Sequence, residues 1–338
     1  MGTKILIIQT AFIGDAILTL PLIQEVYKRY KNPSIDVICI PSTKDIFSSS
    51  PYVNKTFVLD KKNKHKSILQ TIKFALTIRK NNYELLLSPH RSFRTSLVVL
   101  LSGAKNKIGF DVASLSFVYS EKIKYEKDFH EVKRNLSLLN DKKLLENWKI
   151  LPECILPELD ESIAGEIKGK RFITIAPGSV WATKKYPWEY FSVVISELIN
   201  DGFEIALIGG SEDKELCEKI KNHTDKSNGI LNFAGKLNLL ESISLLKRSE
   251  LLISNDSAPT HMGMCADIPV LTIYCSTVPE FGFYPYNGKS AFVSYNELDC
   301  KPCGIHGHDK CPVKTFDCGK KLLPSDILKE VYILLKKN

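Results

Sequence analysis

The sequence of 338 residues contains no long uninterrupted apolar stretch. No run reaches about 18 apolar residues, which excludes an ordinary membrane-spanning helix, so we expect any membrane contact to be peripheral. The segment that opens the chain, MGTKILIIQTAFIGDAILTLPLIQ, is apolar, but Asp15 interrupts it and no small-residue cleavage site follows. We therefore expect this segment to belong to the mature protein and not to a signal peptide.

Two common phosphate-binding motifs are also missing. Neither G-x-G-x-x-G nor G-x-x-x-x-G-K-[ST] occurs, which disfavours a dehydrogenase-type dinucleotide site and a P-loop. Short internal repeats and low-complexity tracts are absent too. With 44% hydrophobic and 25% charged residues the composition is that of a globular protein, and the length favours two domains.

Positive charge is in excess, with 46 Lys and Arg residues against 38 Asp and Glu, a net charge of +8. This balance predicts attraction to an anionic partner: a phosphorylated metabolite, nucleic acid or an acidic membrane surface. The run KKNKHK, residues 61–66, is typical of a solvated loop. The other basic residues are scattered and form no compact patch interleaved with aromatic residues.

Apolar, β-branched runs alternate with segments of helical period in both halves of the chain. The first half reads KILIIQ, AILTLPLIQEVYKRY, IDVICIP, ILQTIKFALTIRKNN and YELLLSP, and the second half reads RFITIAPG, WEYFSVVISELINDG, FEIALIGG, ELLISND and PVLTIYC. This alternation predicts an α/β protein with two Rossmann-like, doubly wound parallel sheets that face a cleft. A lysine-rich stretch between the halves marks the boundary, so we expect domains at residues 1–165 and 166–338, the second with a terminal helix.

Polar residues follow several of the predicted strands, and ligands of such folds bind beyond the carboxyl ends of the strands. Asp15 follows the first strand at the start of a helix, where it would be either an N-cap or a general base. Lys184 and Lys185 lie in the loop after RFITIAPG, between tryptophan and tyrosine residues that would fix their position. A lysine posed in this way suits a phosphate group.

Two further loops of the second domain also carry polar residues directly after a predicted strand. Ser211, Glu212 and Asp213 follow FEIALIGG, where a carboxylate can either hydrogen-bond a ribose or cap a helix. In NDSAPTH, residues 255–261, the free amides of a helix start would combine with Ser257 and Thr260 as an anion site. Together these corners predict a pocket for a nucleoside diphosphate.

These motifs, in this order, resemble the bacterial lipopolysaccharide heptosyltransferases of glycosyltransferase family nine, which have the two-domain GT-B fold. The matching segments are Ile13-Gly14-Asp15, Pro177-Gly178, Lys184-Lys185-Tyr186-Pro187, Gly209 to Glu212, and Asn255-Asp256-Ser257 with His261. The resemblance covers nearly the whole chain. The sequence departs from it in two places, Ala258 in place of a glycine and residues 274–277 (YCST) in place of a Gly-Pro-Thr or Gly-Pro-Ser turn.

The resemblance implies a role for individual residues. Asp15 would be the general base, with an ordinary aspartate pKa of about 4, and Lys184 would meet the donor pyrophosphate. The other donor-binding residues would be Glu212 at the adenosine ribose, Asp256 at the donor sugar, and Ser257, Thr260, His261, Ser276 and Thr277 near the phosphates. The lysine and the helix amides would stabilise the leaving diphosphate, so no cofactor is expected for catalysis.

The first domain would bind the acceptor. Arg91 and Arg94 follow the strand YELLLSP, and His130 and Arg134 lie one helical turn apart. Such side chains suit acidic sugars or phosphates, and they are equally typical of ordinary surface charge. The resemblance implies an inverting transfer of heptose from ADP-heptose to the lipopolysaccharide inner core, in the cytoplasm and in peripheral contact with the inner membrane.

Four of the nine cysteines are clustered: Cys300, Cys303, Cys311 and Cys318 form C-x2-C-x7-C-x6-C within residues 300–318. This spacing predicts a structural zinc site, with two disulfides or unbound thiols as the alternatives. Two other functions stay open. A GT-B transferase or epimerase would use a different nucleotide sugar, and a zinc-ribbon protein would bind nucleic acid, which the scattered basic residues disfavour.

Overall fold

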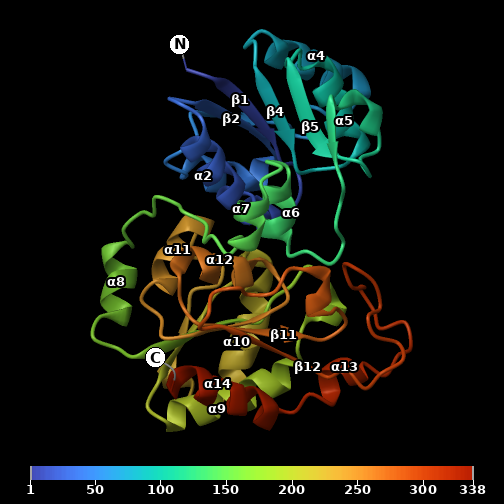
Figure 1. Ribbon diagram of the computed structural model, residues 1–338. Helices are drawn as coiled ribbons and strands as arrows, with labels where there is room; N and C mark the ends of the chain where they lie inside the picture. The colour runs from blue at the N-terminus through green and yellow to red at the C-terminus, as the bar shows by residue number, and fades with distance from the viewer. Residues whose placement is uncertain (1, 337–338) are drawn as a thin grey trace. The chain divides into compact units, whose positions relative to one another are not determined.

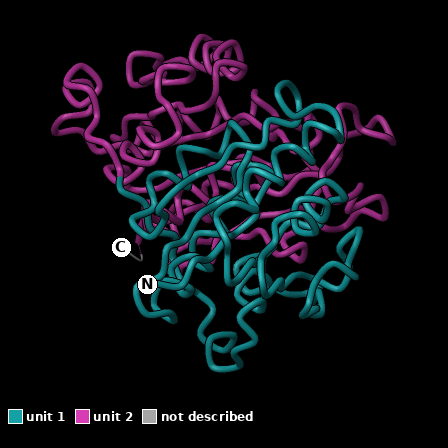
Figure 2. Tube along the Cα trace, turned by 90° about the horizontal axis from the view of Figure 1, so that it is seen from above, with its two compact units in different colours: residues 1–155 teal, residues 156–338 magenta. Residues whose placement is uncertain are grey.

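The computed structural model describes residues 2–336, and the chain divides into two compact units, unit 1 (residues 1–155) and unit 2 (residues 156–338), coloured separately in Figure 2. The division lies ten residues before the predicted boundary at 165 (165 − 155 = 10). Its position follows from a change of hydrogen-bond partner. The amide of Ile155 donates to the Ser49 carbonyl of unit 1 at 2.7 Å, whereas the carbonyl of Pro157 accepts from the Ser244 hydroxyl of unit 2 at 2.6 Å.

Unit 1 is built on a six-stranded sheet with the order β3-β2-β1-β4-β5-β6, in which every described pair is parallel. Its strands are β1 (Lys4–Ile8), β2 (Ser34–Cys39), β3 (Lys55–Val58), β4 (Leu85–Ser88), β5 (Asn106–Phe110) and β6 (Glu121–Ile123). Its α-helices are α1 (Ile13–Ile17), α2 (Leu20–Arg29), α3 (Lys44–Ser48), α4 (Ile68–Arg79), α5 (Phe93–Leu101), α6 (Glu131–Ser137) and α7 (Lys142–Glu146). The strand order reverses between β1 and β4, which is where a doubly wound sheet binds its ligand.

Unit 2 repeats this plan with the order β12-β11-β10-β7-β8-β9, again parallel throughout the described pairs. Figure 1 labels β11 and β12 of this sheet. Its strands are β7 (Phe172–Ala176), β8 (Glu204–Leu207), β9 (Ile230–Asn232), β10 (Leu252–Asn255), β11 (Val270–Tyr274) and β12 (Ala291–Ser294). Its α-helices are α8 (Glu161–Ile167), α9 (Trp188–Asn200), α10 (Lys214–His223), α11 (Leu239–Leu246), α12 (Ala258–Ala266), α13 (Asp317–Lys320) and α14 (Pro324–Lys336). Here the order reverses between β7 and β10.

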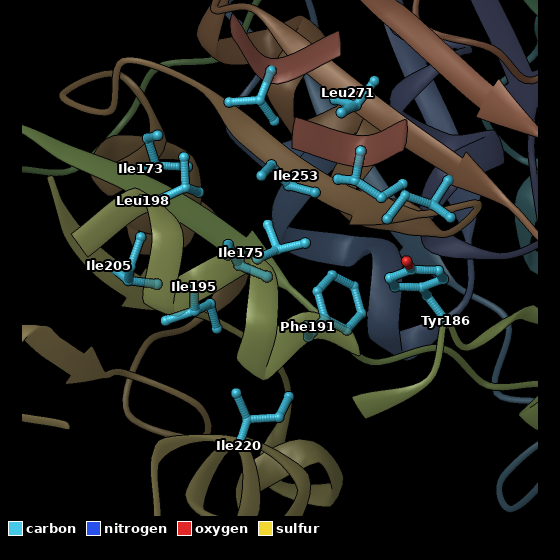
Figure 3. Packing of buried hydrophobic residues seen from close by; sticks show 14 of the residues in the cluster. Ile173, Ile175, Tyr186, Phe191, Ile195, Leu198, Ile205, Ile220, Ile253 and Leu271 are labelled. Atoms are coloured by element: carbon cyan, nitrogen blue, oxygen red, sulfur yellow. The ribbon is translucent and has the colours of Figure 1, made fainter. Parts of the chain in front are cut away.

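Each unit has its own apolar core, because parallel strands buried on both faces must be covered by helices. Figure 3 shows the core of unit 2, in which Ile175 and Ile253 of the sheet pack against Phe191 and Ile195 of α9. In unit 1, α4 and α5 cover one face of the sheet together. The predicted α/β class with two parallel sheets is therefore confirmed. Within residues 2–336, no helix is both long enough and apolar enough to cross a membrane.

Candidate functional site

Asp15 lies at the reversal of strand order in unit 1. β1 ends at Ile8 and α1 begins at Ile13, with Phe12 as the N-cap, so Asp15 is the third residue of the helix. The alternative in which Asp15 is the N-cap is therefore wrong. Its carboxyl group stays at the first turn of α1, where the helix dipole favours a negative charge.

The carboxyl group of Asp15 has a pKa raised to about 7. Burial is the largest cause, followed by the negative charge of Glu131. The backbone amides of Asp15 and Phe12 and the positive charge of Arg91 oppose these effects and lower the pKa. The expectation of an ordinary pKa near 4 is corrected by this environment, because desolvation disfavours the charged form of a carboxyl group.

Arg91 and Arg94 follow β4 but differ in their surroundings. Arg91 is exposed, and its guanidinium lies 4.0 Å from the centre of the Tyr125 ring. Its positive charge acts on the carboxyl group of Asp15. Arg94 donates to the carbonyls of Lys61 and His65 at 3.3 and 3.2 Å. Arg94 therefore holds the loop before α4, whereas the exposed positive charge of Arg91 lowers the pKa of Asp15.

His130 and Arg134, the two other predicted acceptor residues, are buried in unit 1. The ring of His130 caps α6 by accepting from the amide of Val132 at 3.2 Å. Arg134 donates from Nε to Glu131 at 2.7 Å and from Nη1 to the Lys127 carbonyl at 2.8 Å. These contacts give both residues a place in the architecture of α6, and their contact with an acceptor stays a prediction that this geometry does not favour.

In unit 2, Asn255 joins the corners at the reversal of strand order. Its side chain is fully buried. The Nδ2 group donates to the Pro177 carbonyl at 2.7 Å, and Oδ1 accepts from the amide of Tyr186 at 3.0 Å. One amide side chain thus links the end of β10 to the end of β7 and to the segment that enters α9.

Lys184 and Asp256, which the sequence places 72 residues apart, form an ion pair with 2.6 Å between Nζ and Oδ2. Their side chains are only 14% and 11% exposed. The hydroxyl of Thr277 donates to the same carboxylate oxygen at 2.6 Å. The structure therefore brings three predicted donor-binding residues together, with the lysine held by the carboxylate.

The corner after β8 brings Asp213 against a glycine. Glu212 is exposed and accepts a 3.4 Å bond from the Ser211 hydroxyl. Asp213 accepts from the amide of Gly210 at 3.1 Å, and a Cβ added to Gly178 would collide with its carboxylate. Only glycine at residue 178 allows the loop after β7 to approach so closely, and burial raises the pKa of Asp213.

The sequence predicts that Ser257 and Thr260, at the start of α12, form an anion site, but in the structure the Thr260 hydroxyl bonds to other hydroxyls of unit 2. Thr260 lies inside a chain of hydroxyls, 2.9 Å from Ser254 and 3.0 Å from Thr272, and is fully buried. Thr260 therefore fixes α12 onto β10 and β11. Ser257 is half-buried, and its hydroxyl lies 3.3 Å from the Asn255 carbonyl.

Within residues 255–277, three buried polar atoms have no hydrogen-bond partner: Nδ1 of His261, the hydroxyl of Tyr274 and the hydroxyl of Ser276. Burial lowers the pKa of His261 to about 4, so the ring is neutral near pH 7. Burial also raises the pKa of Tyr274, and the negative charge of Asp256 adds to this effect. Native proteins leave few buried polar atoms unpaired, so each of these three atoms is a candidate to bind a ligand or an ordered water.

The cysteine-rich segment, residues 300–318, is hydrogen-bonded to the turn that carries Lys184. The amide of Thr183 donates to the His308 carbonyl at 3.0 Å, and the amide of His308 donates to the Thr183 hydroxyl at 2.8 Å. Gly307, with φ of +84°, would place an added Cβ 3.2 Å from Cγ of Lys184. The same segment reaches the end of β11, because the amide of Cys303 donates to the Ser276 carbonyl at 3.0 Å.

The four clustered cysteines are free thiols. Over residues 2–336, no three or more His, Cys, Asp and Glu side chains are arranged to hold a metal ion. In this arrangement the four sulfur atoms do not form a ligand set. The predicted zinc site stays a prediction, and a native mass spectrum without bound metal would contradict it.

The family model of glycosyltransferase family 9 (heptosyltransferase) matches residues 71–311, more than half of the chain. The chain belongs to glycosyltransferase family 9. It is therefore a glycosyltransferase, as the order of its motifs predicts. Lipopolysaccharide heptosyltransferase 2 of Escherichia coli K12 is 23% identical over 294 residues, which are 82% of this chain and 84% of that protein.

Two solved structures share the fold of this family 9 chain. The ADP-heptose lipopolysaccharide heptosyltransferase II of E. coli superposes with a TM-score of 0.80 at 20% identity and covers 99% of both chains. A family 9 glycosyl transferase from Veillonella parvula superposes with a TM-score of 0.83 at 19% identity, over 99% of this chain and 98% of that one. The predicted GT-B fold is confirmed.

Sequence reasoning gave no role in the site to Thr183 or Tyr274, and it named Asn255 only as part of a matching segment, without the bonds that its side chain makes. A signal existed for Asn255, because a buried amide directly before Asp256 at a strand end must find partners. A signal existed for Tyr274 too, since a tyrosine that ends a buried strand has a hydroxyl to satisfy. The pairing of Thr183 with residue 308 had no local signal.

Proposed function

We propose that this glycosyltransferase transfers heptose, with inversion, from ADP-heptose to an inner-core lipopolysaccharide acceptor. The family match over residues 71–311 carries the proposal. It is supported by the E. coli relative, which is named a lipopolysaccharide heptosyltransferase, and by the solved E. coli protein, which is named for ADP-heptose. We place the reaction in the cytoplasm, with unit 1 in contact with the membrane that holds the acceptor.

In this proposal unit 2 binds the donor. The Nζ of Lys184 and the Thr277 hydroxyl already meet at the carboxylate of Asp256. An incoming diphosphate would take Lys184 as a partner, while Asp256 would keep the Thr277 bond and accept from the sugar. Charge-assisted hydrogen bonds of this kind stabilise the leaving diphosphate as its negative charge develops.

Asp15 of unit 1 would act as the general base. The acceptor hydroxyl bonds to the anomeric carbon and loses its proton to the Asp15 carboxylate, and the carbon–oxygen bond to the diphosphate breaks with its electron pair. A pKa of about 7 suits this role, because a base is most effective when its pKa is near the working pH. The exposed charge of Arg91 would meet an anionic acceptor.

The test combines a binding and a turnover measurement. Calorimetric titration with ADP, UDP and GDP should show the strongest binding for ADP, and heptose should pass from ADP-heptose to heptose-deficient lipopolysaccharide. Asp15→Asn should abolish transfer and keep ADP binding, whereas Asp45→Asn, an exposed carboxylate in the first turn of α3, should leave both unchanged. Preference for UDP, or turnover by Asp15→Asn, would contradict the proposal.

A further inference from the structure

The excess positive charge of the chain is concentrated in one segment of unit 1. Residues 61–82 contain seven basic residues and no acidic one. Because the whole chain has a net charge of +8, all other residues together contribute only +1 (8 − 7 = 1). Four of these seven residues belong to the run at residues 61–66, and Lys73, Arg79 and Lys80 of the following segment extend it.

Helix α4 presents this charge together with apolar side chains. Leu69, Lys73, Leu76 and Lys80 are all exposed, Leu69 to 72% and Leu76 to 44%. Their spacing of four, three and four residues places them on one face of the helix. The opposite face of α4 is buried in the core through Thr71, Ala75 and Ile78.

Two neighbouring features extend this surface. Helix α5 packs against α4 (Figure 1) and exposes Phe93 and Leu100 to 50% and 44%. These two residues are seven positions apart and so share a face of α5. Lys66, also exposed, directly precedes Ser67, which caps α4 in a reciprocal bond with Gln70.

The surface is tied to the loop that precedes the general base. Arg94, in the first turn of α5, donates to the carbonyls of Lys61, His65 and Lys66 and so fixes the start of α4. The ammonium of Lys61 donates to the carbonyl of Thr10 at 3.1 Å and to its hydroxyl at 2.8 Å. Thr10 belongs to the loop between β1 and α1, so α4 and Asp15 are linked within one unit.

We propose that the exposed face of α4, with Lys66 and the exposed face of α5, docks unit 1 onto an anionic lipid surface. The leucines enter the boundary between headgroups and acyl chains, and the lysines meet lipid phosphates. Exposed leucines and a phenylalanine favour lipid over nucleic acid, which would use the charges alone. Like charges disfavour a second copy of the chain on this face.

This inference rests on the proposed function only for its purpose, which is to bring Asp15 to a lipid-linked acceptor. Binding to vesicles can be measured without donor or acceptor. We expect the full chain to sediment with vesicles of equal parts phosphatidylglycerol and phosphatidylethanolamine and to stay in solution with phosphatidylcholine vesicles. Binding should weaken as salt is added, because exposed charges are screened beyond about 8 Å at 0.15 M ionic strength.

The charge variant Lys66→Gln/Lys73→Gln/Lys80→Gln should bind the anionic vesicles about a hundredfold more weakly, at about fivefold for each lysine near the surface. The matched control is Lys142→Gln/Lys143→Gln/Lys149→Gln, which removes three exposed positive charges elsewhere in unit 1. The control should bind as the unchanged protein does. Equal binding by both triple variants, or equal loss in both, would overturn the proposal.

The apolar part has its own variant, Leu69→Ser/Leu76→Ser, which removes only exposed side chains and leaves the core face of α4 intact. We expect about tenfold weaker vesicle binding. Transfer to a soluble core oligosaccharide should be unchanged in this variant, whereas transfer to vesicle-embedded lipopolysaccharide should fall. If the unchanged protein transferred to neither acceptor, the proposed function would fail, and if it transferred without binding vesicles, the docking surface would fail.

Discussion

The environment of Asp15 departs from what its position in the sequence implies. An acidic residue in the first turn of a helix is stabilised by the helix dipole. Here burial and the nearby charge of Glu131 oppose ionisation more strongly, and the pKa rises to about 7. The side chain therefore changes its charge close to neutral pH, whereas an aspartate in water does so near pH 4.

The transfer rate should depend on pH through this group. A base must be deprotonated, so kcat/KM is expected to rise as the pH increases through about 7. In Glu131→Gln one cause of the raised pKa is removed, and the rise should move to lower pH. Rates of both proteins measured from about pH 5 to pH 9 check this, and a flat profile for the unchanged enzyme would contradict the assignment of Asp15 as the base.

The same pKa predicts a change of stability with pH. The folded pKa lies above the unfolded value of about 3.9, so the contribution of Asp15 to stability is fully present below pH 3.9 and is lost as the pH rises through about 7. Asp15→Asn does not titrate. We expect it to unfold at a higher temperature than the unchanged protein at pH 8, with a gap that shrinks as the pH falls. A constant gap would show that Asp15 is not responsible.

Tyr274 offers a contrast between stability and binding. Its buried hydroxyl has no partner, so Tyr274→Phe should leave the free energy of unfolding unchanged or raise it by about 1 kcal/mol. Because the negative charge of Asp256, a predicted donor contact, adds to the raised pKa of that hydroxyl, we expect the variant also to bind the donor more weakly. The control Tyr190→Phe loses a 3.2 Å bond to the Lys320 carbonyl and should lose stability without a change of donor affinity. Thermal unfolding and donor titration of both variants distinguish these outcomes.

At the scale of elements, the sequence predicted the strands β1, β2, β4, β7, β8, β10 and β11 and did not predict β3, β5, β6, β9 and β12. β1 (KILII) and β7 (FITIA) are runs of buried β-branched residues, which the pattern of the sequence identifies directly. β6 (EKI) and β9 (ILN) were missed because three residues show no period, and β6 is mostly exposed. Such strands exist because their neighbours offer unpaired backbone groups, which a local pattern does not record.

The candidate site also has a part that the sequence predicts and a part that it does not. Asp15 and Asp256 follow predicted strands, so their place at the sheet edge could be predicted from the sequence. The pairing of Thr183 with His308 joins residues 125 positions apart, and the cysteine spacing pointed to a metal instead. No local rule connects a loop near residue 300 to the turn of Lys184.

The cysteine-rich segment should therefore control donor binding through the turn at residues 182–184. Thr183→Val keeps the shape of the side chain and removes the hydroxyl that accepts from the amide of His308. We expect a loss of about 1 to 3 kcal/mol in stability, because that amide is left unpaired, and a weaker affinity for ADP as Lys184 loses its support. Thr77→Val, which removes an exposed hydroxyl of α4 bonded to the Phe74 carbonyl, is the control. Unchanged ADP affinity in Thr183→Val would limit the segment to a role in folding.

At the scale of the whole molecule, the proposed function assigns separate parts of one reaction to two units with separate apolar cores. Unit 2 contains the ion pair between Lys184 and Asp256 and the corners expected to bind the nucleotide, and unit 1 contains Asp15 and the basic face of α4. A ligand stabilises the unit that binds it and leaves the unfolding equilibrium of the other unit unchanged. The donor nucleotide should therefore act on unit 2 alone.

Calorimetric unfolding of the full chain should show this division directly. We expect two transitions, since each unit has its own core. ADP at about 100 times its Kd should stabilise unit 2 by about 2.7 kcal/mol. For a unit of 183 residues (338 − 155 = 183) this raises one transition by about 5 to 10 °C and leaves the other in place. The transition that Asp15→Asn moves at pH 8 belongs to unit 1. If ADP shifted that transition, alone or together with the other, the nucleotide would act on unit 1 and the proposed division between the units would be contradicted.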